Sequence, residues 1–284
     1  MAKIVDLLAA GPTWSFEFFP PRDDAMERQL EKAVHELAPL APSFVSVTYG
    51  ALGSTREYTR DAVVRINEEQ PFPAMPHLTC VGHTRADIDG LLDHYAANGI
   101  ENILALGGDP PADGTDPGGD FTYATDLIEV VRAHPANFCV GVAAHPEVHP
   151  RSPDRATDRQ RLADKLAMAD FAITQFSFLA DEQIKLREEL AALGCATPVI
   201  PSVFPVINAA GVQRMARMNG SVIPPAMLDR LVAATSPEDV VAIGIEVATE
   251  LCERLIVAEM PGIHLYPMNR SESIRRIYGN LGLA

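Results

Sequence analysis

Short apolar runs alternate with longer amphipathic stretches along most of the 284-residue chain. Such alternation is typical of βα units arranged around a parallel sheet. The short runs predict strands at 13–19, 43–50, 76–80, 102–106, 138–144, 171–178, 198–203 and 262–266. Between them, apolar positions recur three and four residues apart and predict helices at 23–37, 55–69, 85–97, 123–133, 159–169 and 181–193. Eight strands separated by helices predict an α/β fold, a (β/α)8 barrel of the TIM type.

The repeat is less regular in the C-terminal third of the chain. Residues 208–258 hold about three helical segments before the last predicted strand, so we predict an extra helix there. A final helix is expected at 271–278, where Gly279 would end it. The length of the chain matches one large barrel. We therefore expect a single catalytic domain over residues 1–284.

The amino-acid composition indicates which kinds of molecule the protein is suited to bind. Lys and Arg number 23 against 38 Asp and Glu, which gives a formal charge of −15. This excess of negative charge disfavours nucleic acid and anionic membranes as partners. The four cysteines lie far apart in apolar runs, and the apolar run before Gly11 is too short for a signal peptide. We expect a cytoplasmic protein with a small-molecule substrate, and the pattern leaves a homo-oligomer open.

The first predicted strand ends in an unusual sequence, SFEFFPPR at residues 15–22. Side chains alternate along a strand, so Glu17 faces away from Phe16 and Phe18, on a partly aromatic face that it shares with Phe19. Burial of a carboxyl group raises its pKa and keeps a proton available near neutral pH. Glu17 is therefore a candidate general acid. The alternative is a strand-end carboxylate that pairs with Arg22 or caps the next helix.

Polar residues gather where the predicted strands end. In a barrel these ends meet at one mouth, where catalytic groups of such enzymes lie. The residues at these positions are Glu17, Thr48, Tyr49, His77, Thr79, Asp109, His145, Glu147, His149, Gln175, Asn208, Asn269 and Arg270. The sequence contains no nucleophile elbow, Walker loop or GxGxxG turn. The set is therefore not that of a hydrolase or of a protein with a P-loop.

Two loops after strands have distinctive sequences. Residues 145–150 read HPEVHP, which brings two His and a Glu together, but two prolines prevent the helix that an HExxH zinc site needs. We predict a loop whose histidines bind a ligand or the backbone, with a metal site as the alternative. In the second loop, at 107–111, two glycines allow close approach to the backbone, and Asp109 precedes two prolines.

With these motifs in view, the chain resembles the methylenetetrahydrofolate reductase family in its bacterial single-domain form. The resemblance rests on SFEFFPPR at 15–22, FVSVTYGA at 44–51, PHLTC at 76–80, GGDPP at 107–111, HPEVHP at 145–150, AITQF at 172–176, IPSVFPVIN at 200–208 and LYPMNR at 265–270. It implies a (β/α)8 barrel that reduces 5,10-methylenetetrahydrofolate to 5-methyltetrahydrofolate. It also implies that NADH or NADPH supplies the hydride through bound FAD.

The resemblance assigns roles to the residues around the folate. It implies that Glu17 protonates the folate nitrogen to open the imidazolidine ring. Asp109 matches a carboxylate beside the flavin and the pterin, and Gln175 matches an amide that contacts pterin and nicotinamide. Tyr266 and Arg270 match an aromatic residue and a cation around the substrate, the Arg being suited to the glutamyl carboxylate.

The implied FAD site departs from the family pattern. The matched cofactor positions are Thr48, His77, Asp109, His145, His149, Asp158 and Lys165. However, the family usually has Arg at position 107 and Tyr at position 145, and Asp164 replaces a basic residue, although Arg161 adds a cation nearby. We therefore expect FAD to bind weakly or not at all.

Two mechanisms are open for an enzyme, and a different class of function is the third alternative. In the first, FAD relays the hydride; in the second, NADH passes it directly to the folate. The third is a folate-binding barrel or subunit that has no reductase activity on its own.

Overall fold

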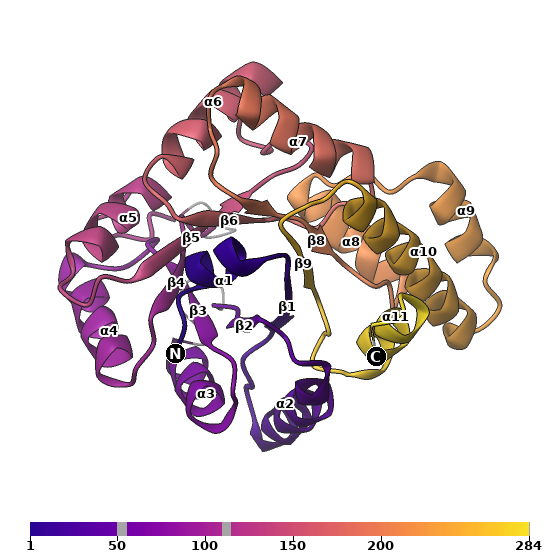
Figure 1. Ribbon diagram of the computed structural model, residues 1–284, viewed down its shortest axis with the longest axis horizontal. Coiled ribbons are helices and arrows are strands. Elements are labelled where there is room, and N and C mark those ends of the chain that lie inside the picture. The colour runs from indigo at the N-terminus through magenta and orange to yellow at the C-terminus, as the bar shows by residue number, and fades with distance from the viewer. Residues whose placement is uncertain (50–55, 110–114, 284) are drawn as a thin grey trace.

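A computed structural model describes residues 1–49, 56–109 and 115–283. The described strands are β1 (Thr13–Phe18), β2 (Phe44–Val47), β3 (Ala74–Thr79), β4 (Asn102–Leu106), β5 (Cys139–Ala144), β6 (Phe171–Thr174), β7 (Val199–Ile200), β8 (Ser202–Val203) and β9 (Gly262–Leu265). All their pairings are parallel, and neighbours follow the order β7-β6-β5-β4-β3-β2-β1-β9-β8. Figure 1 shows the strands at the centre of a ring of helices.

The sheet closes on itself through β7 and β8. These two short strands are separated by Pro201 alone; β7 pairs with β6, and β8 pairs with β9. Proline lacks an amide hydrogen and therefore interrupts the ladder, while its carbonyl oxygen still accepts from the amide of His264 at 2.9 Å. The predicted strand at 198–203 is thus one strand interrupted at a proline. The predicted (β/α)8 barrel is confirmed.

The helices form the outer layer. They are α1 (Ile4–Ala10), α2 (Asp24–Leu37), η1 (Ala38–Leu40), α3 (Arg56–Glu69), α4 (Arg85–Ala97), α5 (Ala124–Ala133), α6 (Arg155–Leu166), α7 (Ala180–Ala192), α8 (Ala209–Asn219), α9 (Pro225–Ala233), α10 (Pro237–Val257) and α11 (Glu272–Asn280). Three helices, α8 to α10, separate β8 from β9, which confirms the irregular C-terminal third. None of the described helices is long and apolar enough to cross a membrane.

Some sequence expectations fall outside the described residues. These are the end of the predicted strand at 43–50, the start of the predicted helix at 55–69, and the two prolines of the GGDPP sequence.

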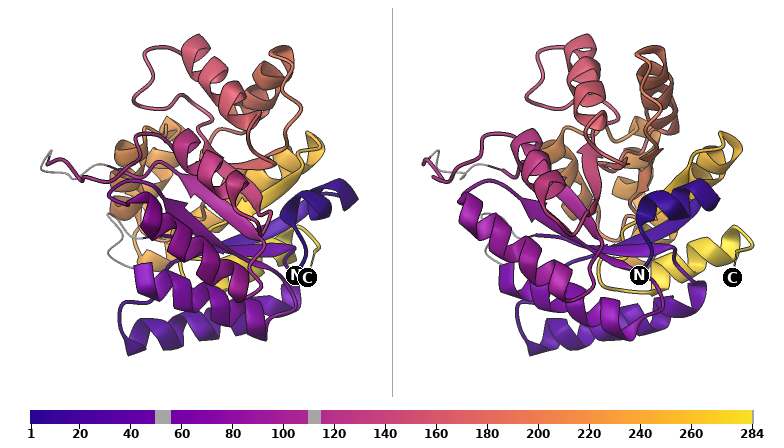
Figure 2. Two further views of the ribbon diagram at one scale, coloured as in Figure 1. Left: turned by 90° about the vertical axis from the view of Figure 1, so that its left-hand side faces the viewer. Right: turned by 60° about the vertical axis from the view of Figure 1, so that its left-hand side comes forward.

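Helix α1 was not predicted, and it determines which end of the barrel is open. Ile4 is fully buried and packs with inward-facing side chains of β2, β3, β4, β5, β6 and β7. Its amide donates to Asn102 Oδ1 at 2.7 Å. Figure 2 shows α1 at one end of the strands, with the loops that follow the strands at the other. Because α1 covers the N-terminal end, we look for the site at the carboxyl ends of the strands.

Candidate active site

Glu17 lies near the carboxyl end of β1 and points into the barrel. It is 7% exposed, whereas Phe16 and Phe18 are buried in the apolar layer between strands and helices. The predicted alternation along this strand is therefore confirmed. The expected aromatic face is wrong in detail, because the side chains nearest the carboxylate are imidazoles. Glu17 Oε2 lies 3.4 Å from Nε2 of His264 on β9 and 3.4 Å from Nε2 of His77 on β3.

His264 is a residue that the sequence analysis missed. It is fully buried, and its Nδ1 lies 2.7 Å from Ser15 Oγ. The ring stacks on Phe44 with centroids 6.0 Å apart. The sequence did contain a signal for its role. His264 lies in an apolar strand two residues before Tyr266, and alternation puts these two side chains on the same face of the strand.

His77 is held inside the barrel rather than at its rim. It is 7% exposed, and burial lowers its pKa, an effect that the neighbouring Glu17 carboxylate partly opposes. Among the described residues, its Nε2 is buried without a well-aligned hydrogen bond. The sequence analysis placed His77 in the cofactor site; the structure places it beside the candidate general acid.

Tyr266 and Gln175 directly follow β9 and β6. Tyr266 is buried against Phe204, with ring centroids 5.8 Å apart, and against His264. Burial raises the pKa of Tyr266 well above its ordinary value, and the Glu17 carboxylate acts in the same direction. Gln175 follows β6 and is half-buried, and its side-chain oxygen accepts from the amide of Phe176 at 3.0 Å. Both residues therefore stand at carboxyl ends of strands, and Tyr266 is close enough to Glu17 for the carboxylate to act on its pKa.

The remaining predicted residues lie farther out. Asp109 follows β4, its side chain is 93% exposed, and it lies 3.7 Å from the exposed Arg151. Arg270 is also exposed. Thr48 is half-buried at the end of β2, where its amide donates to Phe18 O at 2.9 Å. These three residues mark the rim of the mouth rather than its floor.

The other predicted cofactor residues form a separate cluster after β5. His145 and His149 are in edge-to-face contact, with ring centroids 4.4 Å apart. Burial, with His149 and Lys165 adding to it, lowers the pKa of His145 to about 4. Asp158 Oδ1 accepts from the His149 amide at 3.1 Å. His149 Nδ1 accepts from the backbone amide of Arg151 at 3.0 Å, and the binding of a ligand by these histidines stays a prediction.

The metal alternative for the HPEVHP loop has no support in the described residues, among which no group of three or more His, Cys, Asp or Glu could hold an ion. The Glu147 carboxylate accepts instead from Ser177 Oγ at 2.9 Å. Burial raises the pKa of Glu147, and the bond from Ser177 opposes this rise.

Arg159 organises this cluster and was missed in the sequence analysis. It is 3% exposed and donates to Asp158 Oδ2 at 2.6 Å and to Glu189 Oε2 at 2.7 Å. Its remaining hydrogen bonds go to the carbonyl oxygens of His145, Pro146 and Glu147. We predicted the helix to begin at 159, whereas α6 begins at Arg155. An arginine three residues before Leu162, on the apolar face of the helix, was the signal that could have revealed it.

Lys165, the cation of this cluster that matches the FAD site, is not free for the diphosphate of FAD. Phosphate oxygens need cations or amide hydrogens that are free to contact them. Lys165 Nζ instead donates to Ala143 O at 2.7 Å, and burial lowers the pKa of Lys165 to about 8. Asp164, on the same helix, adds an exposed carboxylate. We therefore derive no chemical step through FAD.

Lys165 yields a prediction about stability. Its pKa is about 8 in the folded protein and 10.5 ordinarily, so between these pH values the unfolded chain binds more protons and stability rises with pH. Below pH 8 the buried charge costs its full amount in the folded state. Lys165→Met is therefore expected to raise the free energy of unfolding at pH 7 by up to about 3 kcal/mol. The gain should disappear above pH 10.5, where the amine is neutral in both states.

Urea denaturation at pH 7 and at pH 10.5 measures this difference, and Lys32→Met is the matched control because the Lys32 side chain is 73% exposed. A pH-independent difference would contradict the assigned cause.

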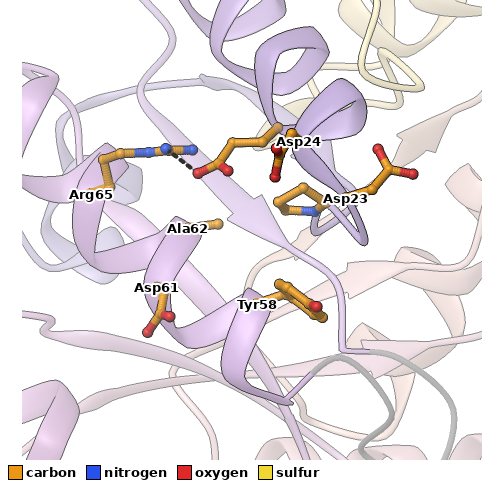
Figure 3. A pocket seen from close by; sticks show the side chains of 8 residues that line it. Asp23, Asp24, Tyr58, Asp61, Ala62 and Arg65 are labelled. Carbon is orange, nitrogen blue, oxygen red and sulfur yellow. Dashed lines mark hydrogen bonds and ion pairs between the residues drawn. The ribbon is translucent and has the colours of Figure 1, made fainter.

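A surface pocket of about 310 Å³ lies outside the barrel, between α2 and α3 (Figure 3). It is lined by Pro21, Asp23, Asp24, Glu27, Tyr58, Asp61, Ala62 and Arg65. Four of these eight side chains are carboxylates, and Arg65 is engaged by Glu27 at 2.6 Å. An acidic pocket on the helix layer suits neither a glutamyl tail nor a diphosphate. We therefore keep the barrel mouth as the candidate active site.

Comparison with known proteins gives consistent results. Residues 2–282 match the family described as methylenetetrahydrofolate reductase. The chain is 35% identical over 273 residues to 5,10-methylenetetrahydrofolate reductase of Pectobacterium carotovorum subsp. carotovorum, with 95% of this chain and 90% of that protein covered. It is 34% identical over 298 residues to the probable methylenetetrahydrofolate reductase (NADH) of Oryza sativa subsp. japonica, with 99% of this chain and 50% of that protein covered.

Among solved structures, the chain is similar in fold to an uncharacterized protein from Clostridium thermocellum described as binding two copies of 5-methyl-5,6,7,8-tetrahydrofolic acid. The TM-score is 0.63 at 13% identity, and 96% of each chain is covered. At this identity the likeness shows the barrel fold alone.

Proposed function

The chain belongs to the methylenetetrahydrofolate reductase family of oxidoreductases, and from this premise we propose that it reduces 5,10-methylenetetrahydrofolate to 5-methyltetrahydrofolate with NADH. Glu17 serves as the general acid. The observation that carries the proposal is the position of this carboxyl group, buried at the closed floor of the mouth with two imidazoles on a single oxygen. A proton donor in that position has a use in catalysis that a folate-binding module would not have.

The reaction balances with one proton and one hydride. Glu17 gives its proton to N10 of the folate, the bond between N10 and the methylene carbon breaks, and an iminium forms at N5. The hydride from nicotinamide C4 then adds to the methylene carbon and produces the methyl group and NAD⁺. Glu17 is left as a carboxylate and regains a proton from solvent. Both substrates must be present together for this sequence of steps.

The residues around Glu17 can position the folate. In the proposal, Gln175 contacts the pterin through its side-chain amide, and Tyr266 forms an apolar wall beside it. Asp109 and Arg270 act at the rim, where their exposed side chains can contact the substrate, Asp109 from beside Arg151. Arg270 is suited to the glutamyl carboxylate, since a guanidinium can bind both carboxylate oxygens.

Direct transfer from NADH is favoured over a flavin relay by the cluster after β5. A diphosphate would have to compete with Ala143 O for Lys165, and it would lie on a helix that carries Asp164. The name of the rice relative specifies NADH, which supports NADH as the donor. A flavin relay remains the alternative within the same family.

The test is NADH oxidation by purified protein, with its visible spectrum recorded first and no flavin added. We expect a colourless protein that oxidises NADH only when methylenetetrahydrofolate is present. Initial rates should follow a sequential law, because both substrates bind before the hydride moves. The same assay with NADPH measures the preference between the two donors.

A stoichiometric yellow cofactor with ping-pong kinetics would contradict direct transfer and restore the flavin relay. The absence of turnover, even with FAD supplied, would support the folate-binding barrel instead.

A further inference from the structure

Both imidazoles next to Glu17 approach the same oxygen of its carboxyl group. Among the described contacts, both His264 Nε2 and His77 Nε2 lie 3.4 Å from the same oxygen, Oε2. The Glu17 carboxylate also acts on the pKa of Tyr266, which follows β9, and Ser46 on β2 lies 3.4 Å from His264 Nε2. None of these contacts involves the second oxygen, Oε1. The two oxygens of the candidate acid therefore have different surroundings.

The position of the His264 ring follows from strand register. Ser15 is paired with His264 across β1 and β9, and with Phe44 across β1 and β2. These three side chains thus lie at one level inside the barrel, where Phe44 stacks on the imidazole at 6.0 Å and Ser15 Oγ approaches Nδ1 at 2.7 Å. A flip of the ring would lose the contact with Ser15 Oγ, and a tilt would disturb the stacking on Phe44. Its Nε2 is therefore held toward Glu17.

The neighbours of the ring select one tautomer. An ionised carboxylate can only accept a hydrogen bond, whereas a serine hydroxyl can donate one. If Ser15 donates to Nδ1, the hydrogen of neutral His264 lies on Nε2 and points at Glu17 Oε2. The reverse tautomer would direct a lone pair at the carboxylate, which is unfavourable in a fully buried position. With Nε2 protonated, Ser15, His264 and Glu17 have complementary donors and acceptors, and Ser46 Oγ, 3.4 Å from the same Nε2, can also accept from it.

We propose that Ser15 and His264 form a positioning pair that fixes the acid proton of Glu17 on Oε1, the oxygen facing the substrate. Because His264 donates to Oε2 in both states of the carboxyl group, Oε2 is always an acceptor and the proton has one place to reside. The proton then leaves from Oε1 to folate N10 without any rearrangement of the imidazole. Neither residue contacts the substrate. The inference rests on the proposed role of Glu17.

The first test is the tautomer itself, and it needs neither substrate nor turnover. The chain has 8 histidines, so ¹⁵N-histidine-labelled protein is compared with His264→Gln to assign the ring of His264 by its disappearance. We expect a protonated Nε2 and an unprotonated Nδ1 at pH 7. A protonated Nδ1 with a bare Nε2, or an imidazolium, would overturn the proposal. In Ser15→Ala the single tautomer should give way to a mixture, and its persistence would remove Ser15 from the pair.

The second test separates positioning from structure. Ser15→Ala is expected to lower kcat about tenfold while the KM for methylenetetrahydrofolate changes less than about twofold, because the acid proton is misplaced and the binding groups are intact. Thr13→Val is the matched control: it removes a buried hydroxyl from the same face of β1, and Thr13 Oγ1 has no partner among the described residues. It should leave both constants unchanged.

A kcat for Ser15→Ala equal to that of the unmodified protein would overturn the inference, provided that Glu17→Gln is inactive. If Glu17→Gln retains activity, the proposed acid itself is wrong, and the NMR result alone then decides the tautomer.

Discussion

Glu17→Gln is expected to lower kcat for NADH-dependent reduction of methylenetetrahydrofolate by a factor of about 10² to 10⁴, the usual contribution of a general acid. Glutamine has the shape of the carboxylic acid but cannot give up a proton, so the bond from N10 to the methylene carbon would no longer break readily. The amide oxygen can still accept from His264 Nε2, which lies 3.4 Å from the carboxylate oxygen it replaces. The barrel floor should therefore keep its arrangement.

Steady-state kinetics and binding of 5-methyltetrahydrofolate measure the two parts of this expectation. The KM for the folate should change little and product binding should persist, because the residues that we propose to contact the pterin follow β6 and β9 rather than β1. Glu31→Gln is the matched control, since Glu31 is a half-exposed carboxylate on α2 that pairs with Arg65 and lies outside the mouth. A Glu17→Gln variant with full kcat would rule out the acid role, and loss of folate binding with kcat retained at saturation would make Glu17 a binding residue.

Arg159→Met is expected to lower the free energy of unfolding by about 3–5 kcal/mol, the cost of breaking a buried ion pair by removing one partner. Arg159 is 3% exposed and neutralises Asp158, which is itself 6% exposed. Methionine fills a similar volume but leaves Asp158 without its cation. The backbone carbonyl of His145 also loses its donor, at 3.1 Å. The loop after β5 should loosen as a consequence.

Urea denaturation followed by circular dichroism measures this effect, with Arg161→Met as the control because Arg161 is exposed on the same helix. In Arg159→Met, Glu189 loses its bond from Arg159 but keeps one from Arg155 at 2.8 Å. We therefore expect a decrease near the lower end of the range. A decrease below about 1 kcal/mol, the size of a surface ion pair, would contradict the assignment of Arg159 as the centre of this cluster.

The positions of the strands could be predicted because parallel strands are buried on both faces and read as continuous apolar runs. The predicted strand at 102–106 has the same bounds as β4. The surrounding helices could be predicted in a similar way, from the spacing of their apolar residues. Helix α1 could not be predicted from its own seven residues. Its short apolar segment gains stability only by packing Ile4 beneath side chains from six strands, and these are distant in sequence.

Some features of the candidate site could likewise be predicted from the sequence, and others depend on the tertiary structure. The residues themselves determined that a carboxylate, Glu17, points away from Phe16 and Phe18 near the end of a strand, since alternation is a local property of the backbone. The family resemblance likewise rests on sequence alone. Which groups surround that carboxylate was decided by register between strands, which brings His264 and His77 to it from positions 247 and 60 residues away. Burial of Arg159 and of Lys165 was also decided by packing, because a cation on an amphipathic helix meets solvent or the barrel according to the neighbours that cover it.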